Sequence, residues 1–373
     1  MIPVFRPSMG DEECDAVSAV LRSGWIGLGP RTKEFEERFA DYLGVRYAVA
    51  VNSATAALHL AAKALNLEGA EVVTTPMTFV STNHALLYVG AEPVFCDIEP
   101  DTLNLDAAKI EALVTSRTKA VMVVHYGGYA ADMDRILDIA RRRKLLVIED
   151  CAHACGGEHR GRKLGAIGDI GCFSFHAVKN LATGDGGMVT TNDEAVYRRL
   201  MKLRWLGITK DTWSRESGDS HGYSWYYNVE ELGYKCHMND ITAAIGLVQL
   251  AKLDAANARR RALTERYNRA LAGLSEVETP VRRDYMTMPA SHNYVIRCSD
   301  RDGLHEALKA KGISTGVHYI PNNHYEMYRK FRGATPVCDA VWKRLLTLPL
   351  FPDLSDEEAD RVAAAVVAHL RAH

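Results

Sequence analysis

The stretch CFSFHAVKNLATGDGGMVTTND, residues 172–193, combines an aromatic strand pattern, a single lysine and a run of glycines. Lys179 follows the apolar run at 172–175 and precedes the GDGG motif at 184–187. Glycines at such a position allow positive φ angles and a close approach of two backbones. A lysine in a loop is more often a solvated charge than a functional group, so this stretch alone leaves both interpretations open.

Outward from this stretch, short apolar runs rich in β-branched residues alternate with helical patterns. Continuous apolar strands separated by helices are typical of a parallel sheet that helices cover on both faces. The sequence therefore predicts an α/β fold with a mostly parallel central sheet. The runs that carry this prediction are 47–52, 70–76, 92–99, 119–126, 144–150 and 171–176.

The C-terminal third has a different organisation. Residues 237–271 read as one long helix, because Ile241, Ile245 and Val248 recur at i, i+4 and i+7 and Asp240 is an acidic residue for its first turn. A strand, a helix and a closing helix follow, which indicates a small α+β domain. We expect a large domain at 1–245, with an active-site loop near 207–235, and a small domain at 246–373.

Composition narrows the class of protein. The 373 residues are 47% hydrophobic and 25% charged, with a net charge of −2, which is ordinary for a globular enzyme. Because no basic tail or long apolar segment is present, we expect neither nucleic acid nor a membrane as a partner. The N-terminal sequence lacks a signal-peptide pattern. With eight cysteines and no C-x-x-C pair, we expect a cytoplasmic protein with reduced thiols and no metal site.

Polar residues that follow the predicted strands are the candidates for a site, since ligands of open α/β sheets collect at the carboxyl ends of the strands. Ala54 and Thr55 begin a helix after the first run, where free N–H groups can bind a phosphate, although Ser53 can equally be a simple N-cap. Glu149 and Asp150 end an apolar strand, and alternation sends them to opposite faces.

Two further candidates complete the set. Lys179 follows the strand at 171–176, and Phe79 follows Pro76 just beyond another strand. A phosphate-binding helix start, a carboxylate for a ring nitrogen, an amine for an aldehyde and an aromatic face for a flat ring are together what pyridoxal 5′-phosphate needs. In this interpretation the lysine binds the cofactor covalently and moves protons at the reacting carbon.

The segments IEDCAHACGG (148–157) and GDIGCFSFHAVKNLATGDGGMVTTND (168–193) closely resemble the signature of the DegT/StrS-type sugar aminotransferases, which are fold-type I enzymes dependent on pyridoxal phosphate. The resemblance covers nearly the whole chain. It extends from SGWIGLGP (23–30) to TGVHYIP (315–321). It implies a homodimer with active sites at the subunit interface. It also implies a ping-pong transfer of an amino group, from glutamate, to a keto group of a nucleotide-linked sugar.

The resemblance also implies roles for single residues. Lys179 matches the lysine that binds the cofactor, and Asp150 matches the partner of the pyridine nitrogen. The family often has asparagine in the GYNYRM motif, where this chain has Lys235 in GYKCHM, so either Lys235 or Asn228 is expected to reach the neighbouring subunit's phosphate. The other matches are Phe79 on the ring, His153 near the phenolic oxygen, and Ala54, Thr55 and Ser174 at the phosphate.

Trp25, His318 and Tyr319 match segments that border the substrate pocket in relatives, although His318 and Tyr319 can equally be packing residues. Several alternatives remain open at this stage. The acceptor could be a cyclitol or another small ketone, or the chain could be a regulatory protein that binds pyridoxal phosphate without turnover. A metal hydrolase that uses His153, His318 and His324 lacks any recognisable ligand spacing.

Overall fold

The computed structural model describes residues 1–209 and 227–371. Its large sheet has the strand order β1-β9-β8-β5-β4-β2-β3. Four neighbouring pairs are parallel, and only β9 runs antiparallel to both of its neighbours, β1 and β8. The predicted α/β fold with a mostly parallel sheet is therefore confirmed. The strands are β1 (Tyr47–Val51), β2 (Glu71–Thr74), β3 (Glu92–Phe95), β4 (Thr118–Val124), β5 (Leu146–Asp150), β8 (Ile170–Ser174) and β9 (Gly187–Thr191).

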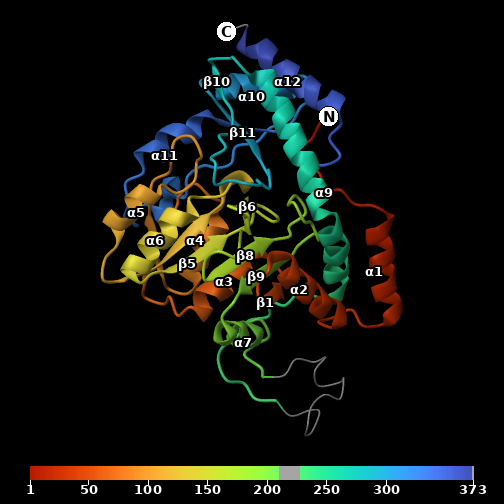
Figure 1. The fold of residues 1–373 in the computed structure, drawn as a ribbon, viewed down its shortest axis with the longest axis vertical. Helices are drawn as coiled ribbons and strands as arrows, with labels where there is room; N and C mark the ends of the chain where they lie inside the picture. The colour runs from red at the N-terminus through yellow and green to blue at the C-terminus, as the bar shows by residue number, and fades with distance from the viewer. Residues whose placement is uncertain (210–226, 372–373) are drawn as a thin grey trace.

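Helices cover both faces of this sheet (Figure 1). In β5, Val147 belongs to the core on one face and Ile148 to the core on the other, because successive strand residues point in opposite directions. The first core packs against α2 and α6, and the second packs against α3, α4 and α7. The helices of this part are α1 (Asp11–Ser23), α2 (Pro30–Leu43), α3 (Ala54–Ala64), α4 (Val80–Tyr88), α5 (Ala107–Leu113), α6 (Met133–Arg143) and α7 (Glu194–Leu203).

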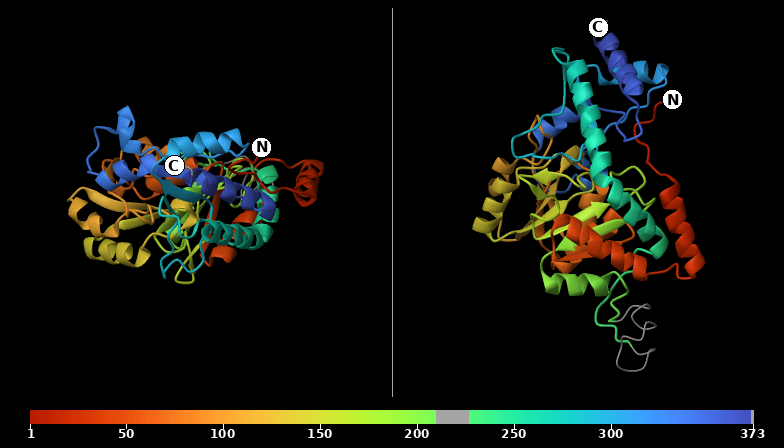
Figure 2. Two further views of the ribbon diagram at one scale, coloured as in Figure 1. Left: turned by 90° about the horizontal axis from the view of Figure 1, so that it is seen from above. Right: turned by 45° about the vertical axis from the view of Figure 1, so that its right-hand side comes forward.

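The predicted long helix is α9 (Asp240–Leu271), which runs from the large sheet to the C-terminal part of the molecule (Figure 1). Two views show α1 and α2 alongside the first half of α9 (Figure 2), and both helices contact it. A Cβ added at Gly246 would come within 2.7 Å of the Phe35 ring, so a glycine there allows α2 to pack closely. Ile241, Ile245 and Val248 are only half-buried in the single chain.

The C-terminal part contains a three-stranded antiparallel sheet in the order β10-β11-β12. Ile2 is buried in the same core and pairs with Ile313, so the first residues of the chain lie with this C-terminal part. The predicted domain limits, 1–245 and 246–373, stay a prediction. The elements are β10 (Val277–Glu278), β11 (Tyr294–Cys298), α10 (Arg301–Ala310), α11 (Pro336–Val341), β12 (Leu345–Leu348) and α12 (Asp356–Leu370).

Short elements complete the fold: the hairpin β6 (Glu158–His159) and β7 (Arg162–Lys163), and the 3-10 turns η1 (Tyr126–Gly128), η2 (Asn322–His324), η3 (Glu326–Tyr328) and η4 (Trp342–Arg344). The predicted active-site loop at 207–235 falls partly on residues 210–226, which lie outside the described residues. Within the described ranges, no helix combines the length and the apolarity needed to cross a membrane.

Candidate active site

A cavity of about 350 Å³ opens at the carboxyl ends of the parallel strands, where the α/β architecture places ligand sites. The structure brings nine of the predicted site residues to its wall. They come from helix starts, strand ends and the segment before η2, which are far apart in the sequence. The nine are Ala54, Thr55, Phe79, Asp150, His153, Ser174, Lys179, His318 and Tyr319.

Lys179 lies in the turn that follows β8, and its backbone N–H donates to the His176 carbonyl at 2.8 Å. Burial lowers the pKa of the Lys179 amine to about 8, and the nearby Asp150 carboxylate opposes this shift. A lysine whose pKa lies close to neutral pH is a useful nucleophile and proton carrier, because a fraction of the amine is uncharged at working pH. The side chain is therefore not an ordinary solvated charge.

Asp150 ends β5 and is 3% exposed. Its two oxygens accept hydrogen bonds, one from Thr82 Oγ1 at 2.8 Å and one from the Ala152 backbone N–H at 3.0 Å. Burial raises the pKa of the Asp150 carboxyl, while these donors and the Lys179 charge favour the ionised form. A cationic ring nitrogen in the cavity would add to the groups that keep Asp150 ionised.

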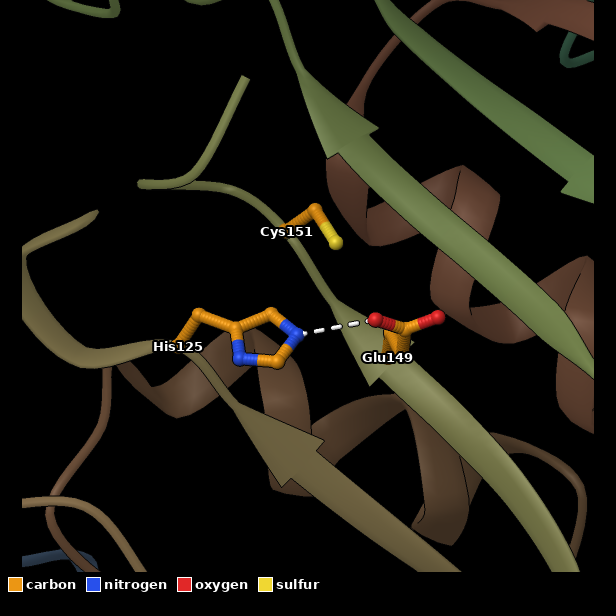
Figure 3. Close-up of side chains that lie close together, drawn as sticks. All are labelled: His125, Glu149 and Cys151. Atoms are coloured by element: carbon orange, nitrogen blue, oxygen red, sulfur yellow. Dashed lines mark hydrogen bonds and ion pairs between the residues drawn. The ribbon is translucent and has the colours of Figure 1, made fainter. Parts of the chain in front are cut away.

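Glu149 points to the opposite face of β5, as strand alternation predicts. Its carboxylate lies 3.0 Å from His125 Nε2, with Cys151 nearby (Figure 3). It also accepts the backbone N–H groups of Gly165, Ile167 and Gly168, at 2.7–3.0 Å. These contacts use both carboxylate oxygens to attach the 165–168 turn to β5, so Glu149 supports the strand that carries Asp150.

The start of α3 agrees with both interpretations of its sequence, the simple N-cap and the phosphate site. Ser53 is an N-cap, since its hydroxyl accepts the Ala56 N–H at 3.1 Å. The N–H groups of Ala54 and Thr55 have no acceptor among the described residues, and both residues line the cavity. A Cβ on Gly187 would lie 2.6 Å from the Ser53 backbone, so glycine is needed where β9 passes this helix start. The capped helix leaves free N–H groups facing the cavity, which suits a phosphate.

His153 and Tyr319 form a hydrogen-bonded pair at the cavity wall, with 2.9 Å between Nε2 and the phenol oxygen. The Gly127 backbone N–H donates to His153 Nδ1 at 3.3 Å, so the His153 proton resides on Nε2. Burial lowers the pKa of His153 well below its usual value, which keeps the ring neutral. His153 therefore donates to Tyr319, and the Tyr319 hydroxyl proton remains available to the cavity.

Phe79 is 57% exposed in the single chain although it is a large aromatic residue at the cavity. Its ring centroid lies 6.1 Å from that of Tyr319. An exposed aromatic face beside a concave site indicates a surface that a flat ligand can cover.

Three predicted residues lie outside this cavity in the single chain. Trp25 donates through Nε1 to the Leu28 carbonyl and lines a separate cavity. The Lys235 ammonium lies 3.3 Å from the centre of the Trp205 ring. Asn228 exchanges hydrogen bonds with Thr209. The predicted roles of Lys235 and Asn228 involve a neighbouring subunit, and the roles of all three residues stay predictions.

The structure also adds wall residues that the sequence analysis did not single out: Phe5, Thr82, Asp185 and His292. Thr82 lies in the first turn of α4, three residues after Phe79, so a search of that helix start for hydroxyl donors could have found it. Phe5 and His292 carry no local motif. Only the fold brings them to the carboxyl ends of the strands.

The donor set of the cavity fits pyridoxal 5′-phosphate. Lys179 supplies an amine, Asp150 supplies a buried carboxylate, Phe79 supplies an open aromatic face, and the α3 start supplies unpartnered N–H groups. These are the amine, carboxylate, stacking and anion-binding functions that a cofactor of this type requires. The fold and the cavity thus define the class of pyridoxal-phosphate-dependent aminotransferases.

Comparison with known proteins identifies the family. The model of the DegT/DnrJ/EryC1/StrS aminotransferase family matches residues 7–367, and the chain belongs to this family. The chain is 44% identical to the spore coat polysaccharide biosynthesis protein SpsC of Bacillus subtilis, over 98% of this chain and 96% of SpsC.

Among solved structures, the aminotransferase TlmJ of Streptoalloteichus hindustanus superposes with a TM-score of 0.93 at 37% identity, covering 100% of this chain and 99% of TlmJ. The putative sugar aminotransferase Spr1654 of Streptococcus pneumoniae, in its PMP form, gives 0.93 at 32% identity, with both chains fully covered. Spr1654 is also known in a PLP form. The protein is therefore a PLP-dependent aminotransferase.

The lowered pKa of Lys179 leads to a first prediction. Only the neutral amine can attack the cofactor aldehyde, so the rate at which cofactor-free protein becomes yellow should rise with pH and level off above about pH 8. Stopped-flow absorbance after mixing with pyridoxal 5′-phosphate measures this rate. A rate that keeps rising toward pH 10.5, the ordinary lysine pKa, would contradict the burial of Lys179.

Proposed function

We propose that the protein transfers an amino group from glutamate to a keto group of a nucleotide-linked sugar by a ping-pong mechanism. The observation that carries the proposal is the placement of Lys179 and Asp150 at one cavity, together with free N–H groups at the start of α3. The names of SpsC and Spr1654 support a sugar as the acceptor. A cytoplasmic location remains a prediction from the sequence.

When bound, the cofactor stores the amino group between the two half-reactions and stabilises the electron pair left at the substrate carbon. In this proposal Lys179 holds the cofactor at rest and then moves a proton to and from the substrate's reacting carbon. Asp150, fixed by Thr82 and the Ala152 N–H, keeps the ring nitrogen protonated. Phe79 covers the ring, and Ala54, Thr55 and Ser174 bind the phosphate.

In this proposal His153 and Tyr319 act as a hydrogen-bonded pair at the cavity wall. Because the proton on His153 Nε2 is donated to the Tyr319 oxygen, the free proton of Tyr319 makes this wall a hydrogen-bond donor for an oxygen atom, such as the cofactor's phenolic oxygen or a substrate carbonyl. We propose that His318 lies beside the substrate, since it lines the same cavity and burial lowers its pKa to about 4, so the ring is neutral.

The active enzyme is proposed to be a homodimer in which the partner subunit completes each cavity. Lys235 or Asn228 would contact the phosphate of the neighbouring site, and Trp25 would border its substrate. The exposed face of Phe79 and the position of all three residues away from their own chain's cavity support this arrangement.

The experiment that tests the acceptor uses enzyme loaded with pyridoxamine 5′-phosphate. Nucleotide-linked keto sugars are added one at a time, together with keto cyclitols as the comparison set. We expect recovery of the yellow band and formation of an amino sugar, measured by absorbance and mass spectrometry. Recovery with keto cyclitols alone would refute a nucleotide sugar as the acceptor.

A further inference from the structure

His292 lies just before β11, is 2% exposed and lines the cavity. Neither the sequence motifs nor the proposed mechanism uses it. Its ring stacks on Phe5, with 5.4 Å between ring centroids and an angle of 3° between the planes, and it lies 4.6 Å from the ring of His153. The ring is thus held on both sides.

A hydrogen-bond network fixes which nitrogen of His292 carries the proton. Asn180 Nδ2 donates to Asn257 Oδ1 at 2.7 Å and to the Ala290 carbonyl at 2.8 Å, so the Asn180 amide has one orientation. The remaining Asn180 atom, Oδ1, is an acceptor 2.9 Å from His292 Nδ1. His292 Nδ1 must therefore be the donor.

The ring is also neutral. Burial lowers the pKa of His292 well below its usual value, and the positive charge of Lys179 acts in the same direction. With the proton on Nδ1, Nε2 carries an unprotonated lone pair and can only accept a hydrogen bond.

The described part of the protein leaves that lone pair without a partner and does not fully enclose it. Nε2 has no hydrogen-bond partner among the described residues, and it is not among the fully enclosed unpaired atoms. Lys179 lines the same cavity but makes no hydrogen bond to His292. The Tyr319 hydroxyl offers a proton from the same wall. The cavity therefore contains one group that can only donate at this point, Tyr319, and one that can only accept, His292 Nε2.

A ligand group that pairs with His292 Nε2 has to be a hydrogen-bond donor. Phosphate, carboxylate and carbonyl oxygens are themselves acceptors. If one of them faced Nε2, both acceptors would stay unpaired, which costs free energy. A hydroxyl group meets the requirement. We propose that His292 accepts a hydrogen bond from a hydroxyl of the keto substrate, and so selects carbonyl compounds that carry a hydroxyl beside the reacting carbon. This inference rests on the proposed function and narrows its substrate class.

The test compares two variants with two acceptors. His292→Phe keeps a flat ring without the acceptor, and His292→Gln keeps an acceptor oxygen. The acceptors are a nucleotide-linked 4-keto-6-deoxyhexose that the wild type aminates and its analogue without the hydroxyl on the adjacent carbon. We expect His292→Phe to lower kcat/KM for the hydroxylated acceptor about 10–100-fold and to leave the deoxy analogue unchanged. His292→Gln should restore part of the loss.

Two results would overturn the inference. One is an equal loss with both acceptors. The other is a matching loss in the half-reaction with glutamate, which would assign His292 to Lys179 or the cofactor. If the wild type accepts no nucleotide-linked keto sugar, the proposed function fails, and hydroxyacetone and acetone then serve as the acceptor pair to decide the role of His292.

A spectroscopic readout is independent of turnover. Nitrogen-15 NMR of histidine-labelled holoenzyme, with the His292→Gln variant to assign the signal, reports the tautomer directly. We expect a neutral ring protonated at Nδ1 from about pH 6 to about 8, because burial lowers its pKa. A ring protonated at Nε2, or charged at neutral pH, would overturn the inference.

Discussion

Replacing Lys179 with alanine is expected to abolish turnover while the fold survives. The substitution removes the covalent attachment of the cofactor and the proton carrier at the reacting carbon, and a positioned proton carrier alone contributes about 10²–10⁴-fold in rate. The main contact of Lys179 that supports the fold is its backbone hydrogen bond to His176, which alanine keeps. Glutamate-dependent bleaching measures the loss, and circular dichroism with thermal melting measures the fold.

Lys309 provides a matched control, because it is an exposed lysine on α10 that pairs with Glu306 on the surface. Lys309→Ala should keep the yellow band and full activity. Turnover by Lys179→Ala at the wild-type rate would show that another group performs the chemistry. Loss of folding in Lys179→Ala would instead show a structural role. The lowered pKa of Lys179 argues against such a role, because it shows that burial disfavours the charged amine.

The second large effect is expected from Asp150→Asn. An amide in place of the carboxylate no longer stabilises a proton on the ring nitrogen, and removing one partner of a buried charge pair costs about 3–5 kcal/mol. At about 1.4 kcal/mol per factor of ten, both half-reactions should slow by roughly 10²–10³-fold or more. Single-turnover absorbance with glutamate measures the first half-reaction.

Thr82→Val gives a graded comparison, because it keeps the Asp150 carboxylate and removes its 2.8 Å hydrogen bond from Thr82 Oγ1, together with the 2.7 Å hydrogen bond between Thr82 Oγ1 and Thr78 Oγ1. A hydrogen bond to a charged group contributes about 1.5–3 kcal/mol, so a smaller loss than in Asp150→Asn is expected. Undiminished transamination by Asp150→Asn would rule out the proposed role of this carboxylate.

Local patterns in the sequence were enough to predict six of the seven strands of the large sheet, all but β9, and much of the cavity wall. Apolar runs of strand length gave the parallel strands, and each strand's last residues gave Asp150 and the helix start at Ala54 and Thr55. Alternation along β5 correctly separated Glu149 from Asp150, because the two carboxylates point to opposite faces. These features depend on neighbours within a few residues.

Features that depend on distant contacts could not be predicted in this way. His292 and Phe5 lie more than 100 residues from Lys179, and only tertiary packing brings them to the same cavity. The tautomer of His292 depends on Asn180 and Asn257, which belong to different segments. Under the proposed homodimer, the environment of Lys235 in the active enzyme would include a second subunit, which local patterns in one sequence do not describe.

The central claim, a cofactor held by Lys179 that accepts an amino group, has a direct test in the visible spectrum of the purified protein. We expect a yellow band after loading with pyridoxal 5′-phosphate. Glutamate should bleach it to the pyridoxamine form, and Lys179→Ala should show neither the band nor its bleaching. A wild-type protein that stays colourless with added pyridoxal 5′-phosphate would contradict the account.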